Sequence, residues 1–178
     1  MEKLTTRQIL EKNISRSSPL RGQFILWLHD IRSLHNVGAA FRNADAFGIY
    51  QLWLSGFTPV PPRPEITKTA IGAEEHVTWK RIEEPSSAIE RLKENGYRII
   101  ALEQTNESIP IWQYKHGNKP ICLIVGNEVT GIDEEILAEI DDAVEIPQYG
   151  MKHSLNVSVA AGVALYAFCE NQLKCSKD

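Results

Sequence analysis

The chain has 178 residues, of which 43% are hydrophobic, and a formal net charge of −4, values that suit one globular domain with a complete core. No apolar run reaches membrane-spanning length, and the first residues, MEKLTTRQILEKN, lack the apolar centre of a signal peptide. A cytoplasmic protein without membrane contact is therefore expected. The three cysteines form no CxxC pair and the histidines form no metal-type cluster, so neither a disulfide framework nor a metal site is expected.

The N-terminal segment, residues 1–22, is basic, whereas the rest of the chain is acidic. It carries five Lys or Arg residues against two Glu, a net +3, which leaves −7 for residues 23–178. Such an arm could contact a polyanion, with Arg7, Arg16 and Arg21 as candidate RNA ligands, or it could be a solvated helix face. A third reading is an amphipathic helix that covers the sheet and buries Ile9, Leu10 and Ile14.

From residue 23 onward, short apolar strands alternate with helical segments. In chain order they are FILWLH, the helix NVGAAFRNADAF, YQLWLS, a proline-rich loop TPVPPRPEIT, VTWKRI, the helix PSSAIERLKENG, YRIIALE, PICLIVG, the helix DEEILAEI, AVEIP and a helix of small residues. This alternation predicts an α/β fold, with a mostly parallel sheet covered by helices on both faces.

Three strands end in polar segments: ALEQTNES, GNEVTGI and PQYGMKHSLN. Because ligands bind beyond the carboxyl ends of parallel strands, these segments are expected to form the walls of one site. GNEVTG has the glycine spacing of a phosphate-binding loop, but Ile132 and Asp133 stand where Lys and Ser or Thr are required, which disfavours an NTPase. Gly126, Asn127 and Glu128 instead suit a small uncharged or cationic organic ligand.

The helix in the segment SLHNVGAAFRNADAFGI is expected to be capped by Asn36 and to hold Arg42 off its apolar stripe. In the segment GMKHSLNVSVAAGVALY, Ser154 and Asn156 are expected at the N-terminus of a slim helix that can pack at short range.

Together, in order and spacing, the segments NVGAAFRNADAFG, LIVGNEVTGI and IPQYGMKHSLNVSVAAGVALY resemble the three signature motifs of the SpoU/TrmH family of RNA ribose 2′-O-methyltransferases. The resemblance runs from about Phe24 to the end of the chain. ALEQT and EIPQYG are most similar to the catalytic domains of eukaryote-type tRNA guanosine methyltransferases in this family. We call the three segments motifs I, II and III.

The resemblance implies a SPOUT fold with a C-terminal trefoil knot over residues 23–178, a homodimer, and S-adenosylmethionine as the cofactor. The cofactor-binding residues would be Leu102, Glu103, Gly126, Asn127, Glu128, Ile146, Pro147, Met151, Ser154 and Leu155.

The resemblance also implies catalytic roles for Asn36, Arg42, Glu128, Ser154 and Asn156. Arg42 matches the family's catalytic arginine. Because a guanidinium stays protonated, binding of the RNA phosphate and stabilisation of the developing alkoxide suit it better than a general-base role, which stays open. The expected substrate is tRNA, at a D-loop guanosine. The alternatives are rRNA, the tRNA wobble ribose, or a catalytically weak module that binds RNA or S-adenosylmethionine.

Overall fold

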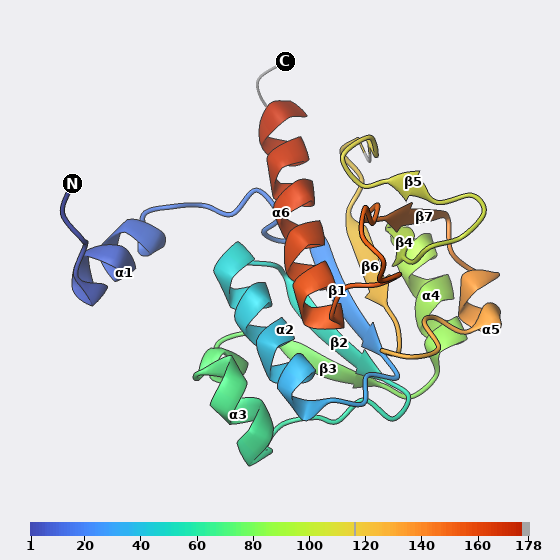
Figure 1. The fold of residues 1–178 in the computed structure, drawn as a ribbon, viewed down its shortest axis with the longest axis horizontal. Helices are drawn as coiled ribbons and strands as arrows, with labels where there is room; N and C mark the ends of the chain where they lie inside the picture. The colour runs from blue at the N-terminus through green and yellow to red at the C-terminus, as the bar shows by residue number, and fades with distance from the viewer. Residues whose placement is uncertain (116, 176–178) are drawn as a thin grey trace.

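The computed structural model describes residues 1–115 and 117–175, so His116 and residues 176–178 lie outside the described part. Its centre is a seven-stranded sheet in the order β3-β2-β1-β6-β4-β7-β5 (Figure 1). Every paired strand is parallel to its neighbour, which confirms the predicted α/β class. The strands are β1 (Phe24–His29), β2 (Gln51–Ser55), β3 (Trp79–Ile82), β4 (Arg98–Leu102), β5 (Ile109–Pro110), β6 (Ile121–Val125) and β7 (Asp142–Glu145).

Helices cover both faces of the sheet, as the unbroken burial of β1 and β6 requires. On one face lie α2 (Leu34–Phe47), α3 (Pro64–Ala70), a short 3₁₀ turn (Ala73–Glu75) and α6 (Val157–Cys175). On the other lie α4 (Pro85–Glu94) and the short α5 (Glu134–Leu137). Alternate residues of β1 enter the two cores: Phe24, Leu26 and Leu28 face α2 and α6, while Ile25 and Trp27 face α4.

The structure differs from the sequence expectations at two helices. Helix α2 begins one turn earlier than expected, because Ser33 and not Asn36 is its N-cap and accepts a hydrogen bond from the Asn36 N–H. This leaves the Asn36 side chain free for other partners. The proline-rich segment is a loop only as far as Arg63, since Pro64 occupies the first position of α3, where a missing N–H costs nothing.

Two glycine contacts bring the helices close together. A side chain at Gly38 of α2 would meet the Ile66 carbonyl oxygen of α3 at 2.3 Å, so these backbones touch. On the other side of α2, Asn43 donates to the Ser158 carbonyl of α6 at 2.8 Å, and a side chain at Gly162 would approach that amide to 3.2 Å. Close packing therefore fixes α2 between α3 and α6, as the small residues of α6 led us to expect.

A polar network lies at the amino end of the sheet. Arg98, the first residue of β4, donates two hydrogen bonds to the carboxylate of Asp142, the first residue of β7, and Tyr114 donates a third. The Arg98 hydrogen bond is the main cause that holds the pKa of Asp142 below its usual range. Burial, followed by the contact with Asp142, raises the pKa of Tyr114.

The first part of the N-terminal segment stands away from the body of the molecule (Figure 1), whereas Ser18 and Leu20 pack on it. Its helix α1 (Thr6–Ile14) is closed by a capping box between Thr5 and Gln8, yet none of its residues is buried. Ile9, Leu10 and Ile14 are all exposed, so the reading of this segment as a helix that covers the sheet is wrong. Within the described ranges, no helix combines the length and the apolar character that crossing a membrane requires.

Candidate active site

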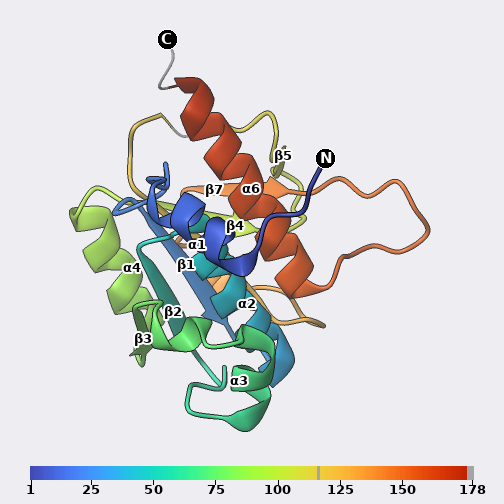
Figure 2. The same cartoon turned by 90° about the vertical axis from the view of Figure 1, so that its left-hand side faces the viewer.

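A cavity of about 330 Å³ opens at the carboxyl ends of β4, β6 and β7, a volume within the usual range for a small-molecule site. Eight of the ten predicted cofactor-binding residues line it: Leu102, Glu103, Gly126, Asn127, Glu128, Ile146, Ser154 and Leu155. Pro147 is outside the lining, and Met151 is fully exposed on the long loop between β7 and α6 that projects from the body in Figure 2.

The wall between β6 and α5 is shaped by glycines. A side chain at Gly126 would lie 2.5 Å from the main chain of Gly131. Gly131 has φ of +71°, and a side chain there would lie 2.3 Å from the Glu103 carboxylate. That carboxylate accepts from the N–H groups of Gln104 and Ile132 at 2.9 and 3.1 Å. The cavity thus combines exposed glycine main chain and a fixed carboxylate with apolar side chains, a set that fits the adenosine part of S-adenosylmethionine.

Glu128 connects motif II to the turn that precedes α2. Its carboxylate accepts hydrogen bonds from the main-chain N–H groups of Arg32 (2.9 Å) and Ser33 (3.1 Å), and from the Asn36 side chain (2.8 Å). Burial pushes the pKa of Glu128 upward, but these donors outweigh burial and hold the pKa below its usual value. The side chain is therefore a fixed carboxylate at neutral pH.

Asn36 and Asn156 join motif I to motif III. The Asn156 side chain donates to Oδ1 of Asn36 at 3.0 Å, across 120 positions of sequence. Its own Oδ1 accepts from the Ser158 N–H at 2.9 Å and so caps α6, as the sequence predicted. Glu128, Asn36 and Asn156 thus form one hydrogen-bonded chain, with one residue from each motif, beside the cavity.

Arg42 is not part of this chain of hydrogen bonds. It lies six positions after Asn36, about 9 Å farther along the axis of α2. The side chain is exposed and makes no hydrogen bond or ion pair with the rest of the described chain. The structure therefore brings together Asn36, Glu128 and Asn156, with Ser154 on the cavity wall, and leaves Arg42 facing solvent.

The predicted RNA ligands of the arm are also exposed. Arg7 pairs with Glu11 on α1 at 2.9 Å. Arg16 and Arg21 line a second cavity of about 290 Å³ together with Tyr50 and His76. This cavity lies at the amino ends of β2 and β3, away from the candidate active site.

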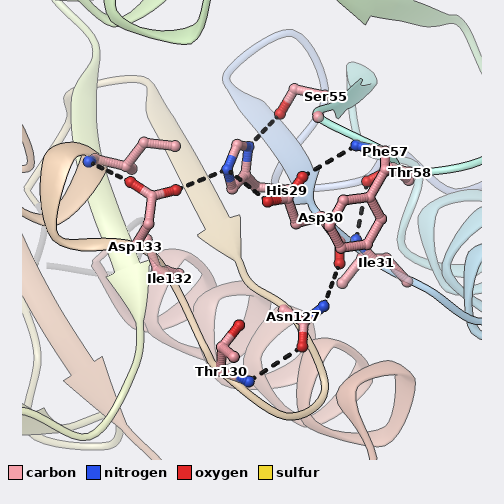
Figure 3. A network of polar contacts seen from close by, with 12 residues as sticks. His29, Asp30, Ile31, Ser55, Phe57, Thr58, Asn127, Thr130, Ile132 and Asp133 are labelled. Carbon is pink, nitrogen blue, oxygen red and sulfur yellow. Dashed lines mark hydrogen bonds and ion pairs between the residues drawn. The ribbon is translucent and has the colours of Figure 1, made fainter.

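Sequence reasoning missed Gln104 and His153, which also line the first cavity, where the Gln104 side chain donates to the His153 carbonyl at 2.6 Å. It also missed a polar network behind motif II, in which His29 contacts Ser55 and Asp133 (Figure 3). Only the strand-end position of His29 and Ser55 could have indicated it.

Ligand atoms of His29, Asp30 and Asp133 lie within 4.8 Å of one another, but His29 already donates to Asp133. The expectation of a metal-free protein stays a prediction.

Comparison with known proteins places this geometry in a family. Residues 23–166 match the SpoU rRNA Methylase family. The tRNA (guanosine(18)-2′-O)-methyltransferase of Aquifex aeolicus is 31% identical over 161 residues, which cover 90% of this chain and 72% of that protein. The enzyme of the same name from Thermus thermophilus is 30% identical over 94% of this chain and 84% of its own length. The chain spans 59% of the length of the corresponding Escherichia coli protein.

Solved structures agree with the sequence match. The crystal structure of the A. aeolicus TrmH/SpoU tRNA modifying enzyme superposes with a TM-score of 0.78 at 27% identity, over 94% of this chain and 86% of that one. The AdoMet-bound rRNA methyltransferase of Sinorhizobium meliloti gives a TM-score of 0.77 at 27% identity, over 85% of this chain and 57% of that one. In motif content, sequence match and fold alike, the chain belongs to the SpoU rRNA methylase family.

Proposed function

We propose that this chain is an S-adenosylmethionine-dependent RNA ribose 2′-O-methyltransferase that acts on tRNA, at a D-loop guanosine. The observation that carries the proposal is the hydrogen-bonded chain Glu128–Asn36–Asn156, which joins the three motifs beside a cavity of cofactor size. Relatives named for guanosine 18 of tRNA match most of the chain and support the choice of substrate. A catalytically weak module would not need the three motifs connected in this way.

A second substrate is also supported. A solved structure from work on the 2-OH methylation of C/U34 on tRNA superposes with a TM-score of 0.74 at 27% identity, and the match covers 97% of that chain. The S. meliloti relative is an rRNA methyltransferase. The wobble ribose and an rRNA ribose are therefore the alternatives.

The cofactor would supply an activated methyl group on its sulfonium, and the chain would supply position and charge. Main-chain atoms near Leu102, Gly126, Ile146 and Leu155 would hold the adenosine, and Glu128 and Ser154 would lie near the methionine part. Pro147 and Met151 would reach the cofactor only after the loop before α6 moves inward. Arg42 would bind the RNA phosphate and stabilise the ribose oxygen as its proton leaves.

The exposed position of Arg42 fits action at a site completed by a second copy of the chain. Helix α6 exposes Val159, Val163 and Tyr166 next to Ala39 and Asn43 of α2. We assign this apolar surface to a homodimer interface, because exposed apolar patches of this kind mark contacts between proteins. Sedimentation equilibrium should give twice the mass of the chain, and Val163→Glu should give a monomer without methyl transfer.

A C-terminal trefoil knot is part of the same proposal. From β4 the chain runs to the edge strand β5, returns to β6 on the other side of β4, and comes back to β7 between β4 and β5. These crossings would allow the segment after β7 to pass through a loop before α6 begins. A crystal structure with S-adenosylhomocysteine bound would trace the path of residues 146–157.

We further propose that residues 1–22 form a basic RNA-binding arm on a methyltransferase domain of residues 23–178 in a cytoplasmic protein. Replacing Arg7, Arg16 and Arg21 together by Ala should weaken RNA binding and flatten its salt dependence. Each lost phosphate contact should reduce the slope of log affinity against log salt by about 0.7 to 0.9. Cofactor affinity should not change, and an unchanged salt slope would reject the arm as an RNA ligand.

Two experiments test the function. Calorimetry on the purified chain should show binding of S-adenosylmethionine and of S-adenosylhomocysteine, and the absence of heat with both would reject the cofactor. Nucleoside mass spectrometry of tRNA and rRNA, from cells with and without the gene, should show loss of one 2′-O-methylguanosine in tRNA. Loss of a methylated pyrimidine or of an rRNA nucleoside would favour the alternatives.

A further inference from the structure

A buried histidine lies behind the cavity, at the carboxyl ends of the two adjacent strands β1 and β2. His29, the last residue of β1, is 6% exposed, and Ser55, the last residue of β2, is not exposed at all. Nδ1 of His29 lies 2.6 Å from the Ser55 hydroxyl, and Nε2 lies 2.9 Å from the carboxylate of Asp133 (Figure 3). The side chain does not line the cavity.

The neighbouring groups fix which way these hydrogen bonds run. The indole N–H of Trp27 can only donate, and it donates to the Ser55 oxygen at 2.7 Å. The Ser55 hydroxyl hydrogen is then available to His29 Nδ1. On the other side of the ring, Nε2 faces Asp133 and, at 3.6 Å, Asp30, and carboxylates only accept. Nε2 therefore carries a proton and donates it to Asp133.

Asp133 connects the histidine to the motif II loop, which we define as residues 126–133. Its other carboxylate oxygen accepts from the Ile136 N–H at 2.9 Å and caps α5, so both oxygens are used. Within the loop, Asn127 and Gly131 exchange two main-chain hydrogen bonds of 3.0 Å. The loop is a closed unit, and all of residues 126–131 line the cavity.

The opposite end of this loop is held by the turn that follows His29. The Asn127 side chain donates to the main-chain carbonyl of Asp30 at 2.8 Å. Asp30 has φ of +56°, a conformation that is uncommon for a residue other than glycine. Its side chain accepts from the Phe57 N–H at 3.0 Å, which holds the turn against the end of β2.

We propose that His29 is a positioning residue for the cofactor site: through Asp133 it anchors one end of the motif II loop, while Asp30 anchors the other. A cofactor would then meet a wall that is already formed and would not have to order it on binding. An apolar side chain at this position would fill the core as well. It would, however, leave the fully buried Ser55 hydroxyl without its partner, which is costly, and would free the half-exposed Asp133 from its link to β1. The inference rests on the proposed function only in that the cavity takes S-adenosylmethionine.

Two substitutions of His29 separate the two ends of the ring. In His29→Gln the amide lies near the position of Nε2 and can still donate to Asp133. In His29→Asn the shorter amide lies near Nδ1, where it can contact Ser55 but not Asp133. The dissociation constant for S-adenosylhomocysteine, measured by calorimetry on the full chain, should stay within about threefold for Gln and rise about tenfold for Asn.

Tyr114→Phe is the matched control. It removes a buried hydrogen bond to Asp142 at the amino end of the same sheet, far from the cavity. Its melting temperature should fall while its affinity for the ligand stays that of the wild type. If His29→Gln and His29→Asn weaken binding equally, or if neither does, the anchoring role is wrong.

Asp133→Asn gives a second measurement if His29→Asn does not fold. An asparagine can still cap α5, but its amide N–H₂ then faces the Nε2–H of His29. Binding should weaken about tenfold, and ¹⁵N NMR of the ring should show the proton leaving Nε2. Unchanged affinity and an unchanged ring spectrum would overturn the proposal. Absence of binding by the wild-type chain would instead reject the proposed cofactor.

Discussion

Two carboxylates, Glu128 and Asp142, lie at opposite ends of the same sheet, and hydrogen bonds hold the pKa of each below its usual value. Asp142 obtains its donors from the side chains of Arg98 and Tyr114. Glu128 obtains two of its three donors from the main chain of the turn before α2 and the third from Asn36. The first arrangement ties two strands together, whereas the second fixes a backbone turn and a motif residue around the cavity. Similar electrostatics thus serve stability at one end and positioning at the other.

Arg42 lies outside both networks and should give the largest effect. Arg42→Ala should lower methyl transfer about 100- to 1,000-fold, the usual cost of losing a group that stabilises transition-state charge. Arg42→Lys should also lose methyl transfer, because the compact ammonium group of lysine cannot make the paired hydrogen bonds of a planar guanidinium. Cofactor affinity should not change, since the side chain does not line the cavity. Single-turnover rates with saturating RNA measure the effect, and near wild-type rates in Arg42→Ala would remove the catalytic role.

Glu128→Gln tests the end of the sheet that we assign to function. Glutamine has the same size, but its amide N–H₂ group would face N–H donors that now point at a carboxylate. We expect cofactor binding to weaken about tenfold, in line with the loss of a hydrogen bond to a charged group, and turnover to fall with it. Calorimetry and initial rates measure both. A variant with wild-type binding and turnover would show that the fixed carboxylate is dispensable.

Asp142→Asn tests the other end and should affect stability alone. The expected loss is about 1 kcal/mol, because Arg98 is partly exposed and water screens the pair. For a chain of this size that corresponds to a fall in melting temperature of about 2 to 4 °C. Cofactor affinity and turnover should stay at wild-type values.

The difference in melting temperature between the wild type and Asp142→Asn should depend on pH, and the direction follows from the pKa of Asp142. Folding lowers the pKa of Asp142, so the contribution of its carboxylate to the free energy of unfolding is complete above the unfolded-state pKa of about 3.9. The contribution is lost as the pH falls through the folded-state value. The melting temperatures of the wild type and Asp142→Asn should therefore converge below about pH 4. A constant difference down to pH 2 would contradict the assignment.

The smallest expected effect is that of metal removal. EDTA should leave methyl transfer unchanged, because His29 and Asp133 are already joined by a hydrogen bond and Glu128 is occupied by N–H donors. Methyl-transfer assays before and after chelation, with Mg²⁺ and Zn²⁺ added back, measure it. Loss of activity that either ion restores would contradict the expectation and would direct attention to His29, Asp30 and Asp133.

Sequence patterns predicted the sheet and the strand ends that carry the site, because alternating apolar runs and polar strand ends are local signals. They did not predict which residue caps α2, since Ser33 and Asn36 are both good caps and only tertiary contacts decide between them. The main-chain donors to Glu128 could not be predicted from the sequence either. Nearly every residue has an N–H group, and only the fold decides which of them point at the carboxylate. The contact of His29 with Asp133 was not predicted either, because the two residues are 104 positions apart and only the fold brings them together.

The central pairing of β1 with β6 has a consequence for the order in which the molecule is made. During synthesis, β1 and β2 leave the ribosome long before the strand that completes the middle of the sheet. The last motif must also emerge before Asn156 can contact Asn36, 120 positions earlier. Until then the main-chain N–H and C=O groups on one edge of β1 stay unpaired. We therefore expect the nascent chain to need chaperone protection through most of its translation, and to gain its site only in the final step.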